Sequence, residues 1–170
     1  TVTTSVDNQF TVENGATVEM GAAAGLEGVL SLAALNEYDI LDRAELHADG
    51  GIAIPKAEIE ITSSRQDATL SIQDAELYSN AGLRLSAGNQ VKILAYANVS
   101  TTGLAGAASG STRADFTGNA KVQLSSGARL FAAQDVELLA GYARGQLQAF
   151  DLQAETRLYN KTAAPIKTAP

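Results

Sequence analysis

Residues 75–85 read AELYSNAGLRL, and three other stretches of the chain share their pattern. The related stretches are AELHADGGIAI at 44–54, AKVQLSSGARL at 120–130 and a weaker copy, NQFTVENGATV, at 8–18. Each stretch has an apolar residue at its third position, glycine at its eighth and an aliphatic residue at its eleventh. A fifth copy begins at residue 164. Self-similarity of this kind indicates an array of stacked structural units.

Alternation of apolar residues with polar or small ones is the commonest local pattern in the chain. It is clear in AEIEIT at 57–62, in ATLSIQ at 68–73 and in VKILAYA at 91–97. Alternation with a period of two is typical of a strand that buries one face. A helix is the main rival over 26–41, where leucines lie near helical spacing. The sequence therefore predicts mostly strand, and leaves strand and short helix open for 26–41.

The intervals between the copies are unequal, which places the variable length in loops. Two-residue Asn-Gly or Asp-Gly turns are missing between the strands, so a parallel coil is favoured over a row of hairpins. We therefore predict an all-β protein, a right-handed parallel β-helix (β-solenoid) of about four to five repeats. The repeats start near residues 8, 44, 75, 120 and 164, and residues 1–170 form a single segment of a longer repeat protein.

Stacking of the copies predicts two internal columns of apolar side chains. The third positions form one column: Phe10, Leu46, Leu77, Val122 and Ile166. The eleventh positions form the other: Val18, Ile54, Leu85 and Leu130. The glycines at the eighth positions are expected at a corner of the chain: Gly15, Gly51, Gly82 and Gly127. Gln123, next to an inward residue, is expected to point outward.

Composition limits the partners that the chain can have. It carries 12 basic and 19 acidic residues, for a net charge of −7, which disfavours nucleic acid and anionic membrane surfaces. There is no cysteine, so disulfides and thiolate metal sites are excluded. No apolar stretch is long enough to span a bilayer as a helix, and no membrane insertion is expected.

Acidic residues gather in one part of the sequence, namely at Glu37, Asp39, Asp42, Glu45 and Asp49. Asp39, Asp42 and Asp49 are the candidate calcium ligands, because calcium prefers several oxygen ligands. The spacing fits no EF-hand loop, and an acidic, solvated loop is the favoured interpretation. Asp39, Asp42 and Arg43 are also the tightest candidate for the acid and base groups of a polysaccharide-cleaving enzyme.

His47 is the single histidine, and a surface position beside a strand is the favoured interpretation for it. With one histidine and no cysteine, the chain has little material for nucleophilic catalysis by Ser/His/Asp or Cys/His groups. No catalytic residue, no cofactor-binding residue and no cofactor is therefore predicted, and calcium is the only ion considered.

Two longer stretches resemble a known family. GLRLSAGNQVKILAYA at 82–97 and GARLFAAQDVELLAGYA at 127–143 are similar to the repeats of large bacterial filamentous adhesins, the haemagglutinin-type exoproteins. The resemblance implies a right-handed β-helix, secretion to the cell surface, and a role in attachment or extracellular structure. It carries no catalytic residues to this chain.

The expected function is that of a structural and adhesive repeat module of a secreted bacterial surface protein, without catalysis. One alternative is a self-assembling extracellular filament or sheath subunit, because open strand edges favour end-to-end stacking. Another is a β-helical polysaccharide lyase or epimerase. The expected partners are flanking repeats or further copies of the chain, end to end, and a cell-surface glycan or protein.

Overall fold

The structure is a computed structural model that describes residues 1–21, 28–143 and 146–165. All regular structure in these residues is strand, which confirms the all-β prediction. The strands are β1 (Val2–Val12), β2 (Thr17–Met20), β3 (Leu30–Ala53), β4 (Lys56–Ile72), β5 (Glu76–Ser79), β6 (Leu83–Gly106), β7 (Ser109–Leu124), β8 (Arg129–Ala132), β9 (Val136–Ala140), β10 (Tyr142–Ala143), β11 (Gln146–Leu147) and β12 (Phe150–Pro165).

The region with helical spacing is also strand where it is described. Residues 30–41 belong to β3, and the remaining part of 26–41 includes residues outside the described ones. Along β3 the exposed and more buried side chains alternate, which matches a strand with one inner face. In the part of the chain that the structure describes, no helix has the length and apolarity that a membrane span requires.

Three parallel sheets contain nearly all of the strands. The β1 sheet has the order β1-β4-β7, the short sheet has the order β2-β5-β8, and the β3 sheet has the order β3-β6-β12, with β9 also paired to β6. The chain passes through the β1 sheet, the short sheet and the β3 sheet in that order three times. We call these passages the first layer (β1, β2, β3), the middle layer (β4, β5, β6) and the third layer (β7, β8, β9, β12).

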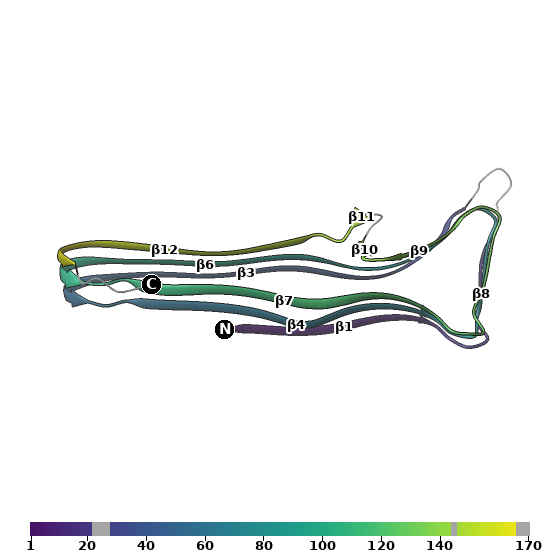
Figure 1. Cartoon of the computed structure of the whole chain (residues 1–170), viewed down its shortest axis with the longest axis horizontal. Coiled ribbons are helices and arrows are strands. Elements are labelled where there is room, and N and C mark those ends of the chain that lie inside the picture. Colours follow the sequence, from purple (N-terminus) through teal and green to yellow (C-terminus); the bar gives the residue numbers. More distant parts are fainter. Residues whose placement is uncertain (22–27, 144–145, 166–170) are drawn as a thin grey trace.

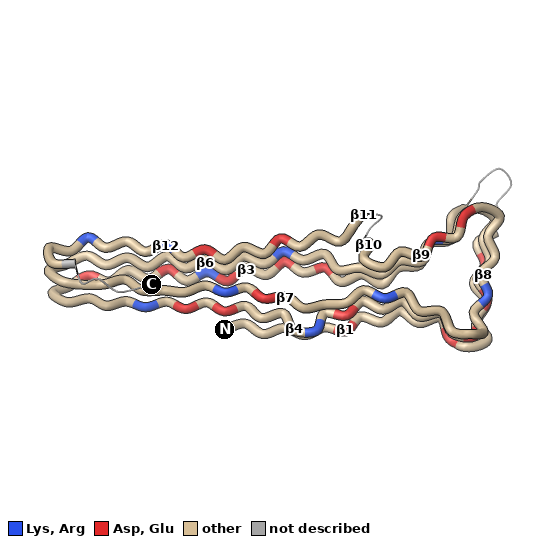
Figure 2. Tube along the Cα trace, viewed as in Figure 1, with Lys and Arg blue, Asp and Glu red and all other residues tan. Residues whose placement is uncertain are grey.

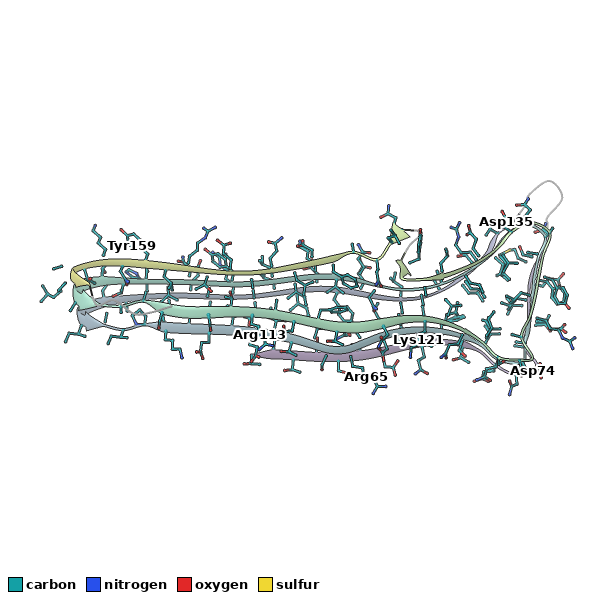
Figure 3. All side chains as sticks on the ribbon, viewed as in Figure 1. Arg65, Asp74, Arg113, Lys121, Asp135 and Tyr159 are labelled. Carbon is teal, nitrogen blue, oxygen red and sulfur yellow. The ribbon has the colours of Figure 1, made fainter. Side chains whose placement is uncertain are left out.

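In Figure 1 the strands of the short sheet nearly superimpose, and those of each long sheet run next to one another along the long axis. The two long sheets run side by side, and the short sheet crosses between them at one end. Asp74 and Asp135 mark the two corners at which the short sheet meets the long ones (Figure 3). The small antiparallel pair β10-β11 lies in the chain between β9 and β12.

The strand register gives the spacing of the layers along the sequence. Leu30 lies beside Leu83 and Leu83 beside Val136, so the chain returns to the same place after 53 residues. Each of the three parallel sheets has three layers among the described residues, with β9 and β12 sharing the third layer of the β3 sheet, whereas the sequence predicted four to five repeats. The segment from β2 to β3 is longer than its counterpart from β5 to β6, which confirms that variable length lies between strands.

The predicted columns are correct in part: Phe10 shares a column with Val122, and Val18 shares one with Leu130, but the other predicted members lie elsewhere. Phe10 lies beside Leu70 and Leu70 beside Val122, whereas Leu46 lies beside Val99 in a different sheet. Leu77 lies between Val18 and Leu130 in the short sheet. Ile54 follows the end of β3, Leu85 lies beside Leu32 and Leu138, and Ile166 is outside the described residues.

The eleven-residue pattern does not predict all members of the columns, because it corresponds to a local strand–corner–strand shape. This shape occurs at more than one corner of each layer. Copies 8–18 and 120–130 cross from the β1 sheet to the short sheet, but copy 75–85 crosses from the short sheet to the β3 sheet. Gly15, Gly82 and Gly127 do lie between strands, as a corner requires, whereas Gly51 lies within β3.

The interior holds two apolar clusters. One lies where the short sheet meets the long sheets and is centred on Leu70, Leu77 and Leu85. The other lies between the two long sheets and is centred on Ile61, Ile93 and Val99. Alanine, valine, isoleucine and leucine dominate both clusters, and their close packing removes apolar area from water, which is the main force that stabilises a fold.

A polar zone of buried side chains is also part of the interior. Asn36 and Asn89 lie side by side in β3 and β6, and the Asn36 Nδ2 donates to Asn89 Oδ1 at 3.0 Å. Gln66 Nε2 donates to Ser63 Oγ at 2.8 Å, beside a bulge of β4 in which Arg65 has a positive φ of 56°. These hydrogen bonds offset the cost of burying polar groups.

We expect amide hydrogen exchange to be slowest in β4, β5 and β6. Each strand of the middle layer has a neighbour on both sides, whereas the strands of the first and third layers have one paired side among the described residues. Because a parallel strand donates alternately to its two neighbours, every second amide of β3 and β12 should exchange faster than those of β6. Exchange measured by NMR would contradict this stacking order if β6 exchanged as fast as β12.

Candidate functional site

The outer face of the β3 sheet contains most of the charged residues singled out by the sequence. From residue 37 to residue 49, residues with odd numbers on β3 point outward, and those with even numbers, such as Ile40 and Ala44, face the interior. Charges of both signs are distributed along the strands of the long sheets in Figure 2. The sheet is therefore a long surface with mixed charge, on which neighbouring strands place residues in rows across the layers.

The three candidate calcium ligands do not come together. Asp39 and Asp49 lie on the outer face of β3, ten residues apart along one extended strand, which is about 33 Å at 3.3 Å per residue. Asp42 has the opposite parity and lies on the inner side, beside Ala95. Among the described residues there is no group of three metal-ligating side chains. The sequence placed these residues close together, but the extended strand separates them.

The same geometry divides the candidate acid–base group of Asp39, Asp42 and Arg43. Arg43 points outward and forms an ion pair with Glu45 of its own strand. Its guanidinium lies 5.3 Å from the ring centre of Tyr96, and the guanidinium of Arg157 lies 5.4 Å from the same ring. Arg43 therefore takes part in a cation–π stack across three strands rather than in a set of groups that converge with Asp42.

His47 contacts two residues that sequence reasoning did not connect with it. His47 Nδ1 lies 2.6 Å from Ser100 Oγ, and His47 Nε2 lies 2.9 Å from Asp49 Oδ2. Ser100 lies directly beside His47 in the register of β3 and β6. The 53-residue spacing of the layers is the signal that would have found this pair, and it is hidden in the sequence by the unequal loops.

The Ser100–His47–Asp49 chain has the residue types of a nucleophilic triad, but its surroundings differ from those of an active site. All three residues lie on the outer face, and the side chains of His47 and Asp49 are more than half exposed. Ser100 lies in the middle strand of three, where backbone N–H groups are used by the parallel ladder. The backbone N–H groups that could stabilise a developing oxyanion therefore already donate to neighbouring strands. Such stabilisation is usually the largest contribution to the rate enhancement of these enzymes.

A second surface feature lies at the short sheet, where an open hollow of about 630 Å³ is bordered by Glu19, Tyr78, Phe131 and Val136. The rings of Tyr78 and Phe131 are stacked with a centroid distance of 4.6 Å and an interplanar angle of 5°. The Tyr78 hydroxyl donates to Glu76 Oε2 at 2.7 Å, and this hydrogen bond raises the pKa of Tyr78.

Glu76, which accepts the hydrogen bond from the Tyr78 hydroxyl, also forms an ion pair across layers, because its Oε1 lies 3.0 Å from Arg129 Nη1. Aromatic rings next to charged and hydroxyl groups form a surface on which a sugar ring can stack and hydrogen-bond. No sequence pattern marks Tyr78 or Phe131 as a pair, since the register that stacks them is not visible in the sequence. Comparisons of the chain with protein-family models, with curated proteins and with solved structures found no match.

Proposed function

We propose that the chain is a segment of a right-handed parallel β-solenoid that serves as a structural and adhesive module of a secreted bacterial surface protein. The observation that supports this proposal is the repeated passage through three parallel sheets in the same order. Crossovers between parallel strands of one sheet are right-handed in nearly all proteins, which gives the hand of the coil. The resemblance of 82–97 and 127–143 to filamentous adhesin repeats supports the extracellular location.

The dimensions suit a rigid extracellular element. A strand of 24 residues, such as β3 or β6, spans about 80 Å at 3.3 Å per residue. The outer faces of such strands form broad surfaces held by a continuous backbone ladder, so side chains at their surface are kept in fixed rows. A rigid array of this kind presents weak binding groups many times, and multivalent attachment strengthens binding without any deep pocket.

The hollow beside Tyr78 and Phe131 is the part of this surface that we propose for contact with a glycan. Adhesion under flow tests this. Beads that carry the chain should be retained on mucin-coated glass and washed from bare glass, and Phe131→Ala should reduce retention. Gln123→Ala changes an exposed residue of the β1 sheet and is the matched control. If wild-type beads are washed from mucin as readily as from bare glass, the glycan-binding proposal is wrong.

The enzymatic alternative is tested in the same samples. The chain is incubated with pectin, alginate and hyaluronan, and the ultraviolet absorbance of unsaturated product ends is followed. We expect no increase above the buffer control. An increase that Asp42→Asn abolishes would replace the adhesive proposal with a lyase.

A further inference from the structure

We propose that copies of this chain stack head to tail, with the third layer of one copy on the first layer of the next, in one register selected by three charge pairs. The inference deepens the proposed structural function and rests on it. The partner is a second copy of the same chain, and its strands continue the three sheets.

The outermost layers expose side chains that occupy core positions. Leu138 lies beside Leu85 in the register but is 50% exposed where Leu85 is 0% exposed. Leu158 lies beside Val99 and is 51% exposed where Val99 is 0% exposed. On the first layer, Phe10 and Leu46 are about 40% exposed although they share columns with buried residues. Among the described residues, apolar rows therefore end at exposed side chains on both faces of the stack.

If the third layer of one copy lay on the first layer of the next, apolar side chains would meet apolar side chains. Leu158 would meet Leu46, Leu138 would meet Leu32, and Val122 would meet Phe10, because each pair occupies one column of the register. Val122 and Phe10 share a column because each lies beside Leu70 in the register. Each contact would bury apolar area that is now exposed, and the ladder hydrogen bonds would continue across the junction.

The outer face of the β3 sheet supplies the charge complementarity. Glu155 shares a column with Arg43, Arg157 with Glu45, and Lys161 with Asp49, since each pair aligns with one residue of β6. Stacking would therefore place three pairs of opposite charge one layer apart. The column of Asp151 and Asp39 is the one on this sheet that places like charges together among the described residues.

The same charges select the register against its neighbours. A shift of two residues in one direction would place Glu155 on Glu45, and a shift of two in the other would place Arg157 on Arg43. A shift of one residue would place inward side chains on outward ones. Like charges directly opposite each other in a sheet are destabilising, so the aligned register is favoured over each of these.

Asp42 would regulate the strength of the junction. It lies on the inner side of β3 in the column of Ala95 and Ala154, so stacking would cover its carboxylate with the third layer of the next copy. Inward-pointing charges on edge strands are a known device that limits edge-to-edge pairing. Asp42→Ala should therefore strengthen association.

Such a contact joins two different surfaces, so it does not close and extends into a filament. Three layers at about 4.8 Å each give a rise of about 14 Å per copy. Electron microscopy of concentrated protein should show filaments with that axial repeat, and sedimentation should show mass that increases with concentration.

Paired charge reversals test the register. Variant one carries Arg157→Glu and Lys161→Glu, and variant two carries Glu45→Arg and Asp49→Lys. Each variant alone places like charges at its junctions and should associate about tenfold more weakly than the wild type. A mixture of the two restores opposite charges at every junction and should form filaments again. Lys121→Glu changes the same type of residue in a column with Gln9 and is the control. Circular dichroism verifies that each variant is folded.

The outcomes separate this inference from the proposed function. A wild-type chain that stays monomeric at high concentration, or a mixture that fails to assemble while both variants are folded, overturns head-to-tail stacking in this register. Beads that still adhere to mucin in that case leave the adhesive function intact. Filaments that form in the predicted register without any adhesion would overturn the adhesive function instead.

Discussion

Replacing Leu77 with aspartate is expected to destabilise the protein by more than about 4 kcal/mol, because an unpaired charge would be buried in the apolar cluster. Leu77 is 0% exposed and lies between Val18 and Leu130 in the short sheet. It has a layer on each side, so the new carboxylate could not turn toward solvent without opening the stack. Urea unfolding followed by circular dichroism measures the change.

Gln123→Asp is the matched control for Leu77→Asp. Gln123 is exposed on β7, next to Val122, which packs against the interior cluster. Its replacement should change the free energy of unfolding by about 0.5 kcal/mol or less. Leu130→Asp should lie between the two, because Leu130 belongs to the third layer and is partly buried. Equal stability of all three variants would mean that the assigned inner and outer faces are wrong.

Gly103→Ala is expected to reduce the stability of the protein strongly, because residue 103 of β6 has no room for a side chain. A Cβ at residue 103 would lie 1.8 Å from the backbone oxygen of Gly50, and Gly103 has a φ of +152° that side chains rarely adopt. The two backbones approach where β3 and β6 run side by side. The expected loss is about 3 kcal/mol, from the strained φ together with displacement of the neighbouring strand.

Gly51→Ala is the control for this change. Gly51 also lies near the end of β3, but a Cβ there would meet nothing within 4 Å. Its stability should stay within about 0.5 kcal/mol of the wild type. Thermal unfolding of the two variants side by side gives the comparison, and a Gly103→Ala protein as stable as Gly51→Ala would contradict the close approach of the strands.

The candidate sites show that closeness along the sequence does not predict which side chains come together. Asp39, Asp42 and Asp49 are neighbours in the sequence, but an extended strand separates Asp39 from Asp49 and turns Asp42 to the other face. His47 and Ser100 are 53 residues apart and lie in contact, because the parallel register of β3 and β6 brings them together. Distance along the chain was therefore a poor guide in both cases. It made the aspartates look closer than they are, and it made His47 and Ser100 look farther apart than they are.

The sequence by itself determined the strand content and most of the side chains that face inward, although Ile54, which was expected inside, is 64% exposed. Leu77, Val122 and Gln123 lie on the predicted faces, because alternation follows from the covalent geometry of an extended chain. The tertiary structure alone decided which strands are neighbours, as in the column of Phe10, Leu70 and Val122. The physical reason is that closing a longer loop costs little additional free energy, so the segment between β2 and β3 can lengthen without changing the stack. Strand pairing is therefore set by the combined fit of whole layers, and no short repeat in the sequence records it.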